Sequence, residues 1–161
     1  MKIPGWVIKN MIFFAGLFCG IVFTLFFAVL YLRNNLILEV PCHNSYEQIV
    51  AKLPEAVSFR NSSWSLRQNP CGLPAGKIAI YELCKRSYAE KILTSDPRMG
   101  VLLPCQFAIY ERSDGKVMLA SWNQTLLMSI LGGMPANIFA GKIIPEQRAI
   151  FRQLIHKKEE K

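Results

Sequence analysis

The chain has 161 residues, 19 of them basic and 11 acidic, and carries a formal net charge of +8. Lys2, Lys9 and Arg33 lie beside one apolar segment, whereas the other basic residues are interleaved with the acidic ones. Nucleic-acid binding needs a basic surface with aromatic side chains along it, and this sequence has no such stripe. We therefore expect no nucleic-acid partner.

Residues 11–32 form an uninterrupted apolar segment without a charge. At about 1.5 Å per residue, a helix of this length crosses the roughly 30 Å of hydrocarbon in a bilayer. Trp6 and Tyr31 stand where interfacial aromatic residues are expected. The sequence thus predicts a transmembrane helix over residues 11–32, preceded by a flank of residues 1–10.

A cleaved signal peptide is the alternative interpretation of this segment. Its hydrophobic core would normally be shorter, and residues 29–33 are too bulky for a small-x-small cleavage site. A lipoprotein signal would need a small residue before its cysteine, whereas Phe18 precedes Cys19. We expect the helix to be retained as the membrane anchor.

The basic residues beside the helix predict its orientation. Lys2, Lys9 and the α-amino group precede the helix, whereas Arg33 follows it and the next basic residue is Lys52. By the positive-inside rule, the N-terminus faces the cytoplasm and the C-terminal domain lies outside. In a bacterial cell this corresponds to a single-pass protein of the inner membrane with a periplasmic domain.

Small residues recur at every fourth position of the predicted transmembrane helix. They place a narrow groove on one helix face, where another helix could approach closely. The residues are Gly16, Gly20, Thr24 and Ala28. We expect them to pack against other membrane protein subunits, with a second copy of the chain as the alternative partner.

The segment after the membrane, residues 33–44, is too short to be a flexible stalk. We expect it to continue the helix briefly or to form an edge strand that ends at Pro41. Residues 45–157 then read as one soluble domain of mixed helices and strands, and residues 158–161 as a charged tail.

The soluble domain begins with a helix signal. Ser45 and Gln48 have the spacing of a capping box, and apolar residues follow at helical intervals until Pro54, where we expect the helix to end. After this helix, the patterns predict a half-buried strand within 59–68, a loop at 69–76, a strand over 77–83 and a helix that ends at 96–97. Two strands follow, over 106–112 and 116–122, joined by a hairpin at Asp114-Gly115. The last two predicted elements are a helix from Asn123 to Leu131 and a final helix that begins at Pro145.

Four segments of this domain together resemble the domain-of-unknown-function 302 (DUF302) family. They are residues 81–84, 88–93, 96–111 and 114–117, which combine a strand, a helix, an Asp-Pro pair, a Leu-Pro-Cys sequence and an Asp-Gly hairpin. The resemblance extends over about residues 45–157. It implies a small α+β domain with helices on one face of an antiparallel sheet, similar to the TATA-binding-protein-like fold, and no established activity.

Cysteines are the residues most open to a chemical role. Cys19 lies in the predicted transmembrane helix, which leaves an even number in a domain that we place in an oxidising compartment. Because Cys84 ends one predicted strand and Cys105 begins another, we predict a Cys84–Cys105 bridge, with Cys42 and Cys71 as the second pair. Buried free thiols remain the alternative.

No complete catalytic or metal-binding pattern accompanies these cysteines. The sequence lacks Cys-x-x-Cys and Cys-x-x-Cys-His, and Cys42-His43 alone does not make a metal site. His43 and His156 have no diagnostic context as a base, and Asp96 and Asp114 stand beside turn-forming residues. We therefore predict no catalytic residue, no metal site and no cofactor.

Two functions from different classes fit the sequence. The first is a membrane-anchored accessory or interaction subunit of a larger membrane assembly, which is not an enzyme. The second is a thiol-redox or ligand-binding domain, for a metal or haem, that uses Cys84 and Cys105.

Overall fold

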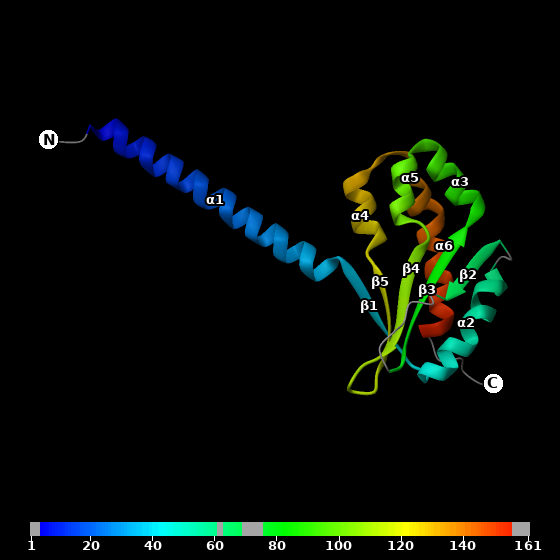
Figure 1. The fold of residues 1–161 in the computed structure, drawn as a ribbon. Helices are drawn as coiled ribbons and strands as arrows, with labels where there is room; N and C mark the ends of the chain where they lie inside the picture. The colour runs from blue at the N-terminus through cyan, green and yellow to red at the C-terminus, as the bar shows by residue number, and fades with distance from the viewer. Residues whose placement is uncertain (1–3, 61–62, 69–75, 156–161) are drawn as a thin grey trace. The chain divides into compact units, whose positions relative to one another are not determined.

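The computed structural model describes residues 4–60, 63–68 and 76–155, and the chain divides into two compact units at the Leu36–Ile37 bond. The first unit contains one helix, α1 (Gly5–Asn35), and the second contains a sheet with its helices. In Figure 1 the helix α1 is blue, and the colours of the second unit run from cyan to red along the chain. We describe the two units separately.

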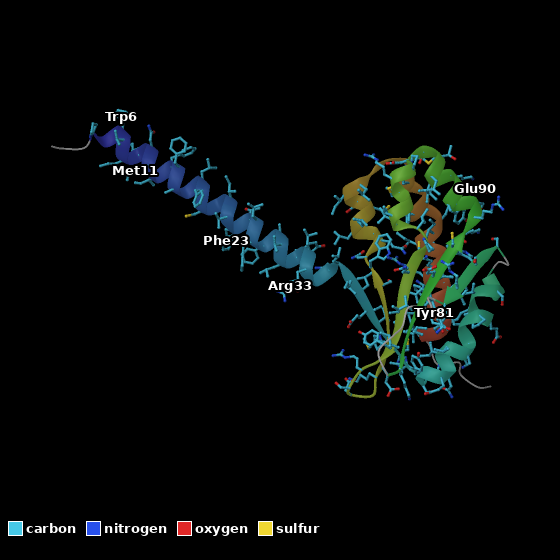
Figure 2. The ribbon with its side chains drawn as sticks, viewed as in Figure 1. Trp6, Met11, Phe23, Arg33, Tyr81 and Glu90 are labelled. Atoms are coloured by element: carbon cyan, nitrogen blue, oxygen red, sulfur yellow. The ribbon has the colours of Figure 1, made fainter. Side chains whose placement is uncertain are left out.

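α1 is a continuous helix of 31 residues with no buried residue. It is long and apolar enough to cross a membrane, and it extends beyond both ends of the predicted span of 11–32. Figure 2 shows Trp6, Met11 and Phe23 projecting from it. The Thr24 hydroxyl donates a hydrogen bond to the Gly20 carbonyl at 2.8 Å, so this polar group is satisfied within the helix.

The second unit contains a five-stranded antiparallel sheet with helices packed against it, as Figure 1 shows. The strands are β1 (Ile37–Cys42), β2 (Trp64–Gln68), β3 (Ile78–Lys85), β4 (Cys105–Glu111) and β5 (Val117–Trp122), in the spatial order β1-β5-β4-β3-β2. This arrangement confirms the predicted α+β class.

Six helical segments accompany the sheet: α2 (Tyr46–Arg60), α3 (Arg86–Ser95), the 3₁₀ helix η1 (Pro97–Leu102), α4 (Gln124–Leu131), α5 (Gly133–Ile138) and α6 (Ile144–Ile155), with the π-helical turn η2 (Phe139–Ile143) leading into α6. α2 and α6 pack on each other and against the sheet, whereas α3, α4 and α5 pack together beyond the ends of the strands (Figure 1). Neither η1 nor η2 was predicted.

The core lies between the sheet and the α2–α6 pair. Side chains alternate along each strand, so one face of β3, β4 and β5 supplies the buried residues. Helical periodicity brings an apolar stripe of α2 and α6 onto that face. The central residues are Leu83, Ile109 and Leu119 from the strands, Ile49 and Leu53 from α2, and Ile150 and Leu154 from α6.

α2 confirms the predicted start of the first helix but not its end. Ser45 Oγ accepts from the Gln48 amide and Gln48 Oε1 accepts from the Ser45 amide, both at 3.3 Å, which is a capping box. The expectation that the helix ends at Pro54 is wrong, because α2 continues to Arg60 through this proline. Burial of Ala56 and Val57 beyond Pro54 stabilises the longer helix.

β1 belongs to the sheet, although its residues were assigned to the connector. It pairs with β5 from Ile37↔Trp122 to Cys42↔Val117 and forms one edge of the sheet. Of the two expectations for this segment, a continued helix or an edge strand, the edge strand is confirmed. Pro41 lies within this strand and not after it. An edge strand accommodates proline because one side of the strand needs no ladder hydrogen bonds.

The hairpin between β4 and β5 is confirmed, and Gly115 is its special residue. The Gly115 amide donates to the Arg112 carbonyl at 2.9 Å, and Gly115 has φ +79°. No other residue of this turn has a positive φ, so Asp114 does not adopt the left-handed conformation that the Asp-Gly pattern suggested. Its carboxylate instead accepts from the Lys116 amide at 3.2 Å.

Candidate functional site

The predicted Cys84–Cys105 bridge is absent, and both thiols are free in the structure. The strand register explains why. Cys105 is opposite Leu83 and shares its buried face, whereas Cys84, the next residue along β3, projects from the other face of the sheet. Cys42 is also free, and its predicted partner Cys71 lies outside the described residues.

The environment of the thiols disfavours thiolate chemistry. Burial raises the pKa of Cys105 to about 11, against the opposing effect of a hydrogen bond with the Gln147 side chain. Burial also raises the pKa values of Cys84 and Cys42. Because the thiolate is the nucleophile and the metal ligand, a raised pKa disfavours both roles for these cysteines.

The other polar residues weighed from the sequence have structural partners. His43 hydrogen-bonds the Ile155 carbonyl through Nδ1 at 2.8 Å, whereas His156 lies outside the described residues. Asp96 accepts from the Arg98 amide at 3.1 Å and so caps η1. Among the described residues, no three His, Cys, Asp or Glu side chains are grouped as a metal site would require.

Sequence reasoning missed a polar cluster between α6 and the β2–β3 side of the sheet. Glu146, in the first turn of α6, accepts hydrogen bonds from Trp64 Nε1 at 2.8 Å, Lys85 Nζ at 3.0 Å and Tyr88 Oη at 2.5 Å. The Lys85 ammonium also lies 4.4 Å from the Tyr88 ring centroid. One carboxylate therefore connects β2, β3, α3 and α6.

The charges in this cluster stabilise each other. Burial alone would lower the pKa of Lys85, but its hydrogen bonds with Glu146 and Tyr88 outweigh that effect and the pKa is raised. Burial would likewise raise the pKa of Glu146, yet the hydrogen bonds from Tyr88, Lys85 and Trp64 lower it. The Lys85 side chain is only 9% exposed, so the ion pair is held largely out of water.

A second ion pair lies on the opposite face of the sheet. Arg67 donates from Nε and from a terminal nitrogen to Glu82 Oε2, at 3.0 and 2.6 Å, and Gln106 donates to Glu82 Oε1 at 3.4 Å. The three residues are neighbours across β2, β3 and β4 in the strand register. Because the carboxylate is satisfied by its neighbours, this row is typical of cross-strand stabilisation.

A cavity of about 240 Å³ lies between α6 and the β1–β5 side of the sheet, with the start of α4 at its border. Its apolar wall consists of Leu38, Val40, Leu119, Trp122, Ile144, Phe151 and Ile155. Ligand sites are typically concave and mostly apolar, with a few polar groups that fix orientation. The cavity has this composition, and it is the candidate site in the part of the chain that the structure describes.

Glutamines and arginines supply the polar groups of the cavity. Gln124 is 8% exposed and Gln147 is 4% exposed, and both line it, as do the exposed side chains of Arg148 and Arg152. The sequence held a weak signal for the arginines, because positions four apart share one face of a helix. Nothing in the sequence marked the glutamines as buried.

The small residues of α1 also border a hollow on the helix surface. It is lined by Gly16, Gly20 and Thr24, three of the four predicted residues, together with Leu17, Ile21 and Leu25. An added Cβ at Gly16 or Gly20 would meet no described atom within 4 Å, so neither glycine is required by the fold of this chain. Small residues of this kind permit close packing between helices in lipid.

Comparison with known proteins identifies the family of the sheet-containing unit. Residues 69–154 match the model for "Domain of unknown function DUF302". The chain is 33% identical over 72 residues to an uncharacterized protein of Aquifex aeolicus (strain VF5), covering 45% of this chain and about half, 49%, of that relative. The relative carries no stated activity that could be compared.

A solved structure shares the fold. The crystal structure of an uncharacterized conserved DUF302 protein from Bacillus stearothermophilus aligns with a TM-score of 0.61 at 17% sequence identity. The alignment covers 74% of this chain and 98% of the other. The family match extends over more than half of the chain, and the chain therefore belongs to the DUF302 family.

Proposed function

We propose that the chain is a single-pass accessory subunit of a larger membrane protein assembly, with its DUF302 domain outside the cytoplasm. The observation that carries this proposal is the surface of α1, a helix of 31 residues without a buried residue whose large apolar side chains are exposed along its length. Such a surface is unfavourable in water and favourable in lipid. This surface supports the proposed role of α1 as a membrane anchor.

The orientation rests on the basic residues at the two ends of α1. Lys9 and the N-terminal Lys2 favour a cytoplasmic N-terminus, and the single Arg33 at the other end weighs less. In a bacterium the domain from Ile37 onward would then lie in the periplasm, anchored to the inner membrane.

A reporter fusion tests this orientation. A reporter that is active only outside the cytoplasm is fused after Lys161 in the full chain, and a cytoplasm-only reporter is fused there in parallel. We expect activity from the first and none from the second. Activity from the cytoplasmic reporter alone would overturn the proposed localisation.

The accessory role rests on the groove of α1, because a simple anchor needs no small-residue surface. In lipid, helices associate through close packing, which glycine permits and bulky residues prevent. The groove includes Gly20, where an added Cβ meets no described atom within 4 Å. We propose that a helix of a different membrane subunit occupies it.

Two matched substitutions test the partner. Gly20→Ile places a bulky side chain in the groove, whereas Ala15→Ile makes a comparable change about 140° further round the helix. We expect Gly20→Ile to insert normally and to lose its co-purifying membrane proteins in mild detergent, and Ala15→Ile to keep them. Retention of every partner by both variants would refute the proposal, as would loss of self-association alone, which would identify a second copy as the occupant.

A further inference from the structure

The cavity beside α6 is lined by a polar side chain that forms no hydrogen bond with the described residues and keeps contact with solvent. Gln124 is 8% exposed and lines the cavity, and its side-chain amide has no hydrogen-bond partner among the residues that the structure describes. The other buried glutamine of the wall, Gln147, does have one, the Cys105 thiol. Because the amide faces solvent in the cavity, a ligand oxygen can replace water as its hydrogen-bond partner.

The border of the cavity carries positive charge that is also unpaired. Arg148 and Arg152 lie one helical turn apart on α6, and neither has an acidic side chain within 4 Å in the described parts of the chain. Arg67, Arg86 and Arg98, by contrast, each form an ion pair. Two guanidinium groups beside one opening are complementary to a carboxylate.

The size and the walls of the cavity define the rest of the ligand. Its volume is about 240 Å³, whereas an apolar cavity of about 150 Å³ is known to hold benzene. On that scale the cavity holds an aromatic ring with a short side chain, on the order of ten non-hydrogen atoms. Trp122 and Phe151 supply aromatic surface for such a ring.

We propose that this cavity binds a small aromatic carboxylate, with its ring between the sheet and α6 and its carboxylate at Arg148 and Arg152. The Gln124 amide donates the hydrogen bond that orients the bound oxygen. This assignment goes beyond the membrane-anchored role and does not depend on the orientation of α1.

Binding of 3-phenylpropionate to the full chain in zwitterionic nanodiscs tests the proposal. Isothermal titration is compared with empty nanodiscs, which correct for partitioning into lipid. Two further probes separate the contributions: 3-phenyl-1-propanol lacks the charge and acetate lacks the ring. We expect saturable binding of 3-phenylpropionate only, weakening as salt is added. Binding no greater than in empty nanodiscs, or equal binding of the alcohol, would overturn the proposal.

Substitutions locate the bound molecule. Arg148→Gln and Arg152→Gln should each weaken binding by about fivefold, the scale of one exposed ion pair. Lys91→Gln, an exposed change on α3, should leave binding unchanged. Ser121→Phe fills the cavity and should abolish binding, with circular dichroism to confirm folding. Wild-type affinity in both arginine variants would overturn the site even if Ser121→Phe fails to fold.

Discussion

α6 borders two groups of polar side chains, one around Glu146 and one around the cavity. In the described part of the chain, the side chains of the first group are paired with each other, whereas those of the second group are not. Towards β2 and β3, Glu146 accepts three hydrogen bonds and neutralises a buried lysine. Towards β1 and β5, the Gln124 amide and two arginines line a cavity without partners among the described residues. A fold retains paired polar groups for its own stability, whereas unpaired ones suggest that something else binds there.

Removing the charge of Glu146 should have the largest effect on stability. Glu146→Gln keeps the shape of the side chain but leaves the Lys85 ammonium, 9% exposed, without a counter-charge. We expect the free energy of unfolding to fall by about 2 kcal/mol, below the range for a fully buried pair because Glu146 is partly exposed. Denaturant unfolding of the full chain, followed by circular dichroism, measures this change.

Glu90→Gln is the matched control for that substitution. Glu90 pairs with Arg86 on the surface of α3, and both side chains are mostly exposed. Surface pairs contribute little, so the control should unfold almost as the wild type does. Equal losses in the two variants would contradict the distinction between the two environments.

The contribution of Glu146 should also depend on pH, in a direction set by its pKa. The folded-state pKa is below the ordinary value of 4.5, so the stabilisation is fully present above that value and is lost as the pH falls through the folded-state pKa. The difference in unfolding free energy between wild type and Glu146→Gln should therefore shrink below about pH 4.5. A difference that stays constant down to pH 2 would show that the charge does not matter.

The two buried glutamines should respond differently to substitution. Gln124→Leu removes an amide that contacts solvent in the cavity and should change the free energy of unfolding by less than about 0.5 kcal/mol. Gln147→Leu removes the partner of the Cys105 thiol and should lower it by about 1 kcal/mol. Thermal unfolding of the two variants side by side checks this. Destabilisation by Gln124→Leu as large as that by Gln147→Leu would mean that the amide already has a partner in the protein.

Local patterns in the sequence predicted most of the fold. The capping box at Ser45, the Asn123 cap of α4 and the glycine at position 115 are each confirmed, because each is decided by residues within a few positions. The prediction that α2 ends at Pro54 was wrong because it considered local residues alone. The local tendency of proline to end a helix is overcome by burial of Ala56 and Val57, which depends on distant parts of the chain.

The candidate site could not be predicted in the same way. The cavity is formed by β5, α4 and α6 together with β1, which lies about 80 residues earlier in the sequence. No sequence pattern near Gln124 indicates that its side chain is buried. The Cys84–Cys105 prediction failed for a comparable reason. Because Cys84 and Cys105 lie at the ends of neighbouring strands, the sequence suggested that the two thiols are close. The register of β3 against β4 places them on opposite faces of the sheet, and the sequence does not show that register.

The pairing of β1 with β5 has a consequence for how the domain assembles during synthesis. β1 follows α1 almost immediately, yet the strand that completes its hydrogen bonds lies about 80 residues later in the chain. Contacts between distant segments form late, because the intervening loop must first be closed. The first strand to emerge must therefore wait until β5, which ends at Trp122, has been made. Until then its apolar side chains and unpaired backbone can bind a chaperone or aggregate.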